Sequence, residues 1–129
     1  MSRHAPLVLL AMIVLQAVHA AEEFALEFWN AFPPMRALYG PDSSLGRALF
    51  VLFHMLLLVF GAWCYVQVRR STERARTAMW CWVMVQCGTV AAHLIWMALD
   101  PGFQPGLVTL PLFLISIAAA IAALKRERS

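Results

Sequence analysis

The sequence predicts an all-α integral membrane protein, a bundle of four transmembrane helices with both termini in the cytoplasm. Two observations predict this class. Of the 129 residues, 62% are hydrophobic and 13% are charged, whereas soluble domains are about 45–50% apolar and about 25% charged. The apolar residues also gather into four long runs, and a helix needs about 20 of them to cross a hydrocarbon core ~30 Å thick. A soluble enzyme and a nucleic-acid-binding module are therefore not expected, and nucleic acid is not an expected partner.

Four apolar segments supply the predicted spans, which cover about residues 5–28, 46–68, 77–99 and 107–124. The first span begins at Ala5 and continues through an acidic stretch towards Trp29. Together the spans occupy most of the chain, so residues 1–129 are expected to form a single membrane domain.

Three connections separate these spans. The longest, about residues 30–45, contains Pro33-Pro34 and Gly40-Pro41, which interrupt regular structure, so a loop or short interfacial segment is expected there. The second, residues 69–76, is rich in arginine, and the third, residues 100–106, is a tight turn with two Pro-Gly pairs.

Basic residues predict the orientation, because loops rich in Lys and Arg stay in the cytoplasm. Eight basic residues fall on the side of both termini and two on the other side. The eight are Arg3, Arg69, Arg70, Arg74, Arg76, Lys125, Arg126 and Arg128, and the two are Arg36 and Arg47. We therefore expect a multi-pass protein of the inner (plasma) membrane, in contact with the lipid bilayer.

The first span has a competing interpretation. Arg3, an apolar run and the small residues around His19 resemble a signal peptide with a cleavage site before Ala21. Cleavage would leave three spans and an N-terminus outside the cytoplasm. Retention and cleavage of this segment are both open at this point.

Ionisable residues on three different spans share one predicted depth. His54 lies seven residues past Arg47, and His93 lies seven residues before Asp100, so each is about 10 Å below the outer end of its helix. His19 lies late in the first span, which ascends towards the same side. Ionisable side chains at membrane depth are costly and mark functional sites by default.

The first span presents these groups at the spacing that metal sites use. Glu22 and Glu23 follow His19 by three and four residues, so each can share its helix face. The di-iron bundles use a Glu and a His three residues apart in the same way. With His54 and His93 this gives a mixed nitrogen and oxygen donor set, which suits zinc, iron or manganese. We expect all five residues as metal ligands, and Glu22 and Glu23 as candidate catalytic acid or base groups.

Plainer interpretations fit the same residues. A histidine within a membrane can simply hydrogen-bond a neighbouring helix, and Glu22 and Glu23 can be carboxylates of the headgroup zone. A metal-free network of His and Glu side chains also fits. Thr89, Thr109 and other polar residues of the spans are expected to serve helix packing and hydrogen bonding.

The segment from His19 to Glu23 spells H-x-x-E-E and resembles the HXXEE family of small, multi-span bacterial membrane proteins. In that family a histidine late in the third span is followed, about a dozen residues on, by a Pro-Gly that opens the last span. Here His93 is followed by Pro105-Gly106. The family often has asparagine four residues before that histidine, where this chain has Thr89. The resemblance implies a polytopic membrane protein, and the function of the family is unknown.

The leading functional hypothesis is a His/Glu site near the outer face, metal-loaded and acting as a metal-dependent or acid/base enzyme on a lipid-like or small amphipathic substrate. Electron transfer is the first alternative, because His54 and His93 on antiparallel helices could ligate haem b. A non-catalytic binding or accessory subunit of a membrane complex is the second. Association with a second copy or with another membrane protein is compatible with each hypothesis.

Overall fold

A computed structural model describes residues 4–125, and this part of the chain is helical throughout apart from its connections. The helices are α1 (Ala5–Ala25), α2 (Phe28–Ala31), α3 (Pro33–Tyr39), α4 (Ser44–Arg69), α5 (Ala75–Leu99) and α6 (Leu110–Lys125). The predicted all-α class is therefore confirmed for the described residues.

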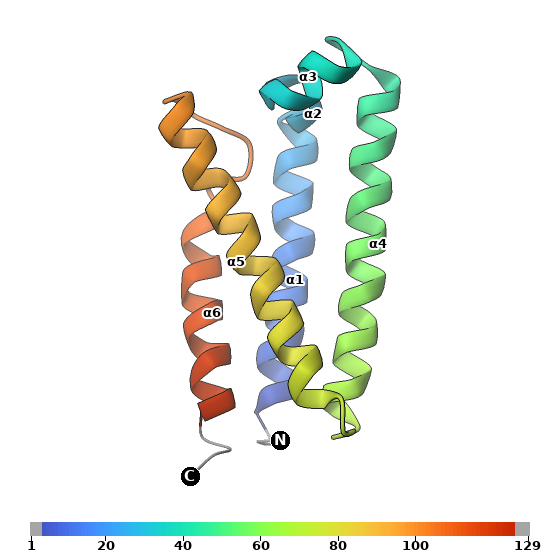
Figure 1. Ribbon diagram of the computed structural model, residues 1–129, viewed down its shortest axis with the longest axis vertical. Coiled ribbons are helices and arrows are strands. Elements are labelled where there is room, and N and C mark those ends of the chain that lie inside the picture. The colour runs from blue at the N-terminus through green and yellow to red at the C-terminus, as the bar shows by residue number, and fades with distance from the viewer. Residues whose placement is uncertain (1–3, 126–129) are drawn as a thin grey trace.

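The four long helices close into a ring. Helix α1 packs against α4 and α6, and α5 packs against the same two helices from the other side. Figure 1 shows α5 crossing the bundle diagonally: it begins beside the C-terminal end of α4 and ends above α6. The short helices α2 and α3 lie at the opposite end of the bundle from the connection between α4 and α5. The start of α1 and the end of α6 lie at the same end of the bundle as the connection between α4 and α5.

Three helices are long and apolar enough to cross a membrane, namely α1, α4 and α5, and α6 is a shorter apolar helix of 16 residues. Large apolar side chains cover their outer faces, such as Leu56 and Val59 on α4 and Ile115 on α6. An exposed apolar surface of this extent is typical of contact with lipid rather than water. These features indicate a membrane protein.

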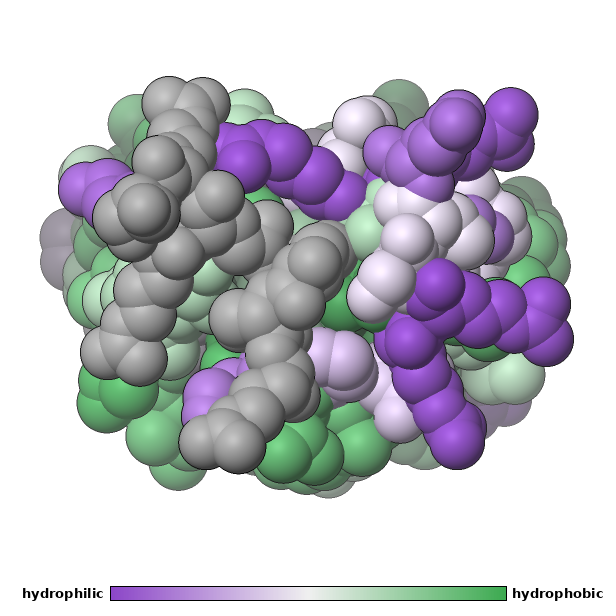
Figure 2. Space-filling model, turned by 90° about the horizontal axis from the view of Figure 1, so that it is seen from below, coloured by the Kyte–Doolittle hydropathy of each residue, from purple (hydrophilic) through white to green (hydrophobic). Residues whose placement is uncertain are grey.

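The charges at the two ends of the bundle differ. The arginines from the end of α4 to the start of α5 and Lys125 of α6 lie at one end, where Figure 2 shows hydrophilic side chains above apolar flanks. Arg36 and Arg47 belong to α3 and α4 at the opposite end. Arg3, Arg126 and Arg128, which also entered the predicted orientation, lie outside the described residues.

Helix α1 ends three residues before its predicted limit. Glu27 adopts a left-handed conformation, with φ of 52°, which stops the helix at Ala25 and starts α2 at Phe28. Its carboxylate accepts a hydrogen bond from Asn30, whose side chain also pairs with Asp42 of the following loop. The connection predicted as a loop or short interfacial segment at about residues 30–45 contains the end of α2 and the short helix α3.

Helix α6 begins three residues after its predicted start. Gly106 has a positive φ of 93°, a conformation that glycine adopts without strain. Residues 105–109 therefore form turns that descend beside α1, and regular helix begins at Leu110. Pro111, the second helical residue, lacks an N–H at a position where a helix does not need one.

The core of α1, α4 and α5 closes around Trp82, which is fully buried. Gly61 of α4 makes room for this ring, because a Cβ at residue 61 would lie 2.8 Å from Cη2 of Trp82. The crossing of α4 and α5 therefore depends on the missing side chain at Gly61.

We predict that Gly61→Ala destabilises the fold by about 1–3 kcal/mol, the usual cost of overpacking a filled core. Gly88→Ala is the matched control, since a Cβ at Gly88 meets no described atom within 4 Å. Alanine is also the better helix former, so the control should be neutral or slightly stabilising. Thermal unfolding in detergent, followed by circular dichroism, measures both. Equal midpoints for the two variants would contradict the close packing at Gly61.

Candidate metal centre

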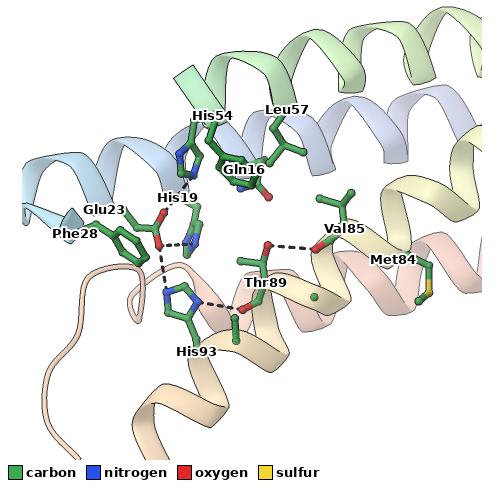
Figure 3. Close-up of a pocket in the computed structure, with 13 residues that line it drawn as sticks. Gln16, His19, Glu23, Phe28, His54, Leu57, Met84, Val85, Thr89 and His93 are labelled. Carbon is green, nitrogen blue, oxygen red and sulfur yellow. Dashed lines mark hydrogen bonds and ion pairs between the residues drawn. The ribbon is translucent and has the colours of Figure 1, made fainter. Parts of the chain in front are cut away.

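The carboxylate of Glu23 lies among three imidazole rings from three helices. Its Oε1 is 3.5 Å from Nε2 of His19 and 3.3 Å from Nε2 of His93, and its Oε2 is 3.3 Å from Nε2 of His54. Figure 3 shows His54 and His93 approaching this carboxylate from opposite sides. Helices α1, α4 and α5 thus each place one histidine Nε2 atom next to the same carboxylate.

The cluster is almost entirely buried. His19, Glu23 and His93 are 1%, 3% and 4% exposed, and His54 is partly buried at the side of the group. The His19 ring also packs edge-on against His93 and Phe113, with ring centroids 5.0 and 4.9 Å apart. These contacts fix the direction in which Nε2 points.

The Nδ1 atoms of His54 and His93 show which tautomer each ring has. Nδ1 of His54 is 3.0 Å from the carbonyl oxygen of Phe50, and Nδ1 of His93 is 3.0 Å from that of Thr89. A carbonyl oxygen can only accept, so both Nδ1 atoms carry the proton and donate. In a neutral ring, Nε2 is then left with a lone pair.

The contacts of Thr109 indicate that the His19 ring also carries its proton on Nδ1. Nδ1 of His19 is 2.7 Å from Oγ1 of Thr109, whose hydroxyl has Glu22 Oε2 at 2.8 Å and the carbonyl oxygen of Gly106 at 3.2 Å as acceptors. Because the single hydroxyl proton goes to one of these acceptors, Oγ1 accepts from Nδ1 of His19. When neutral, the rings of His19 and His54 therefore direct a lone pair at Glu23, whereas Nε2 of His93 faces two acceptors, Glu23 and the carbonyl oxygen of Pro105.

Lone pairs facing a carboxylate in a buried space repel unless a positive charge lies between them. Two arrangements supply it: a metal cation bound by Nε2 atoms and the carboxylate, or additional protons on the rings. Nε2 of His93 also lies 3.0 Å from the carbonyl oxygen of Pro105, a further acceptor. The arrangement as a whole could hold a cation.

Three of these residues meet the geometric requirement for one ion. The ligand atoms of His19, Glu23 and His93 all lie within 4.8 Å of one another. Two histidines and one glutamate are the protein ligands of a known class of catalytic zinc site, in which a fourth position stays open. His54 contacts the other oxygen of Glu23, so it can orient that carboxylate or extend the donor set.

Glu22 points to the neighbouring loop rather than to the histidines. Its Oε1 accepts from the backbone N–H groups of Gly106 and Val108 at 3.1 and 2.9 Å. Its Oε2 accepts from the N–H and the hydroxyl of Thr109 at 3.1 and 2.8 Å. The carboxylate thus satisfies backbone donors that precede α6 and that would otherwise lack partners.

Gly106 lets this loop approach the histidines. A Cβ at residue 106 would lie 2.5 Å from Nε2 of His93 and 2.6 Å from Cε1 of His19. Both its positive φ and this contact require glycine, so the loop forms one wall of the site.

The structure brings together four of the five residues that the sequence analysis proposed as ligands: His19, Glu23, His54 and His93. Glu22 occupies a different position, with both oxygens committed to the loop. Sequence reasoning missed the part that Thr109 plays, because it assigned this residue to packing within its own helix. The signal that could have found it is the Pro105-Gly106 pair, which places an irregular segment before α6.

Comparisons of the chain with protein-family models, with curated proteins and with solved structures find no match. The assignment of function therefore rests on the geometry of the site.

We predict that Glu22→Gln loosens the loop before α6. Hydrogen exchange at the amides of Gly106, Val108 and Thr109 should accelerate by about tenfold or more, the equivalent of one charge-assisted hydrogen bond. Mass spectrometry of the protein in lipid nanodiscs measures this exchange. Glu27→Gln is the control, because Glu27 is exposed and bonds Asn30 instead. Unchanged protection in Glu22→Gln would show that the carboxylate does not hold the loop.

Proposed function

We propose that this chain is a four-span membrane protein whose bundle binds a divalent transition-metal ion, zinc, iron or manganese, through His19, Glu23 and His93. The observation that carries the proposal is that all three histidines have an acceptor at Nδ1 and turn Nε2 toward Glu23. Metal-ligating histidines almost always donate their second N–H to a carbonyl, carboxylate or water. Here each Nδ1 already has such an acceptor, and each Nε2 faces Glu23. Nε2 of His93 would exchange its contact with the carbonyl oxygen of Pro105 for the ion.

The membrane topology is part of the proposal. Helix α6 alone is about 24 Å long, which is shorter than the hydrocarbon core of ~30 Å. The loop of residues 105–109 runs along α1 before α6 and lengthens the segment that would cross the membrane. Irregular backbone is tolerated at membrane depth only where its polar groups find partners in the protein, and Glu22 supplies them. The basic end of the bundle favours both termini in the cytoplasm of an inner (plasma) membrane, which puts the site near the outer face.

The chemistry of the centre follows from its donor set. Bound zinc with three protein ligands would keep a position for water or substrate and would act as a Lewis acid. His54 contacts Oε2 of Glu23 and borders the adjacent cavity, so it can orient the carboxylate and carry a proton to or from that space. These roles support a metal-dependent enzyme acting on a lipid-like or small amphipathic substrate.

The HXXEE resemblance gains a physical interpretation within this proposal. His19 and Glu23 face the centre four residues apart, and Glu22 reaches His19 through the hydroxyl of Thr109. The two glutamates of the motif therefore have different roles, one as ligand and one as support of the loop that positions His19. The proposal includes retention of the first helix rather than its cleavage as a signal peptide, because this helix contributes His19 and both glutamates.

Haem b between His54 and His93 is less well supported. The carboxylate of Glu23 lies between these rings, 3.3 Å from each Nε2. A porphyrin would have to displace this buried carboxylate and the contacts around it. A metal-free polar network in an accessory subunit stays as the second alternative.

We predict one metal ion per chain in protein purified in detergent and reconstituted with zinc, iron or manganese at neutral pH. His19→Ala and His93→Ala should each lose the stoichiometric ion, because each removes a ligand atom. Glu23→Gln should weaken its binding, because the neutral amide oxygen is a poorer ligand than the carboxylate. His4→Ala is the matched control, since His4 is exposed and lies outside the cluster. Elemental analysis after gel filtration measures the content, and circular dichroism confirms that each variant is folded.

Other results would reject the proposal. A folded wild-type protein that retains no stoichiometric metal would favour the metal-free network of His and Glu side chains. A Soret band that disappears in His54→Ala would establish haem instead. Metal retained in all three ligand variants would place it elsewhere in the molecule.

A further inference from the structure

A cavity of about 450 Å³ opens beside the cluster, between α4 and α5. His19, Glu23, His54 and His93 form its polar end, while Leu57, Val85 and other apolar side chains form its walls. Figure 3 shows these groups around a common space. The volume lies in the range of about 300–1,000 Å³ that small-molecule sites occupy.

The cavity opens through the side of the bundle. Phe53 of α4 and Met84 of α5 line it and are themselves 61% and 64% exposed. Gly88, also on its lining, is exposed and leaves open space where a side chain would be. These residues lie well inside their helices, so the opening faces the hydrocarbon of a bilayer rather than water.

The end of the bundle above the cluster is closed by aromatic rings. Phe28 of α2 lines the cavity and packs against Phe50 and Trp96, with ring centroids 5.5 and 5.7 Å apart. Phe32 packs against Phe28 and Trp96 in turn. A ligand from the aqueous side would have to part these rings, whereas a ligand dissolved in the membrane meets the open flank.

Gln16 gives this apolar space one unused polar group. Its side chain lines the cavity and is 2% exposed, yet Oε1 has no hydrogen-bond partner among residues 4–125. Gln86, by comparison, donates to the carbonyl oxygen of Met12 and accepts from Ser116. A buried acceptor left without a donor costs about 1–3 kcal/mol, which a ligand donor would recover.

We propose that the gap between α4 and α5 is a lateral portal for a membrane lipid that carries an O–H or N–H donor, and that the Gln16 amide, whose Oε1 is covered in this conformation, turns toward the cavity to accept this donor. Gln16 lies about one helical turn from His19 and lines the same cavity, so the polar group of a bound lipid would lie beside the cluster. The inference names the substrate class for the metal centre and rests on that proposed function for its catalytic meaning. Binding itself needs only the cavity and Gln16.

The test uses two photoreactive probes, hexadecanol with a mid-chain diazirine and the methyl ether of the same molecule. Both have the same apolar chain, and only the alcohol carries a donor. In nanodiscs, the alcohol should label cavity residues of α4 and α5 about fivefold more strongly than the ether, the equivalent of one neutral hydrogen bond. Peptide mass spectrometry locates and quantifies the labels.

Two variants separate the portal from the polar contact. Gly88→Phe should fill the opening and abolish cavity labelling by both probes, while Gly88→Ala should leave it unchanged. Ala91→Phe adds the same bulk at an exposed position that does not line the cavity and should also have no effect. Gln16→Met should reduce the alcohol to the level of the ether.

Labelling spread evenly over the outer apolar surface, or unaffected by Gly88→Phe, would overturn the portal. Equal labelling by the two probes in the wild-type protein would overturn the role of Gln16, whatever the behaviour of its variant. The metal content of the same reconstituted wild-type samples keeps the two proposals apart. Alcohol-selective labelling in protein that retains no ion after reconstitution contradicts only the metal centre, and bound metal without cavity labelling contradicts only the portal.

Discussion

Three histidine Nε2 atoms meet one carboxylate in a buried part of the bundle, and the surrounding structure is organised around that contact. Helix α1 supplies the carboxylate and one ring, while α4 and α5 each supply another. The loop before α6 completes the group: Thr109 orients His19, and the carbonyl of Pro105 approaches His93. Removing the carboxylate would leave these rings pointing at empty buried space. The packing of the four helices and the geometry of the site therefore depend on the same contacts.

Placing ionisable groups at membrane depth is costly, and this cost constrains what the cluster can be. Each Nδ1 donor has an acceptor, and each oxygen of Glu22 accepts from the loop, so the outer contacts of the network are satisfied. The inner face, made of Nε2 lone pairs and the Glu23 carboxylate, lacks only positive charge. These supporting hydrogen bonds around the candidate ligands are of the kind that metal sites have, and they support the proposed centre. The apolar cavity next to it gives such a centre access to molecules dissolved in the bilayer.

Much of the fold follows from the sequence, because the length and apolarity of α1, α4 and α5 alone specify long membrane helices. The common depth of His19, His54 and His93 could also be obtained by counting residues along those helices. The direction of Glu22 could not, because adjacent residues point about 100° apart on a helix and only the neighbouring loop decides between them. That loop is irregular, so no periodicity predicts that Thr109 turns back to His19. Gln16 gives no sequence signal, since its importance comes from a cavity that α4 and α5 create by diverging.

The most direct measurement of the central claim is X-ray absorption at the zinc K-edge on the reconstituted protein. The account predicts a first shell of nitrogen and oxygen at about 2.0–2.1 Å, with the outer-shell pattern of two imidazole rings. In Glu23→Gln, whose side chain is a poorer ligand, the oxygen contribution should decrease or the ion should be lost. A first shell that contains sulfur, or that shows no imidazole pattern, would place the metal away from His19 and His93. Either result would contradict a centre built on the lone pairs that converge on Glu23.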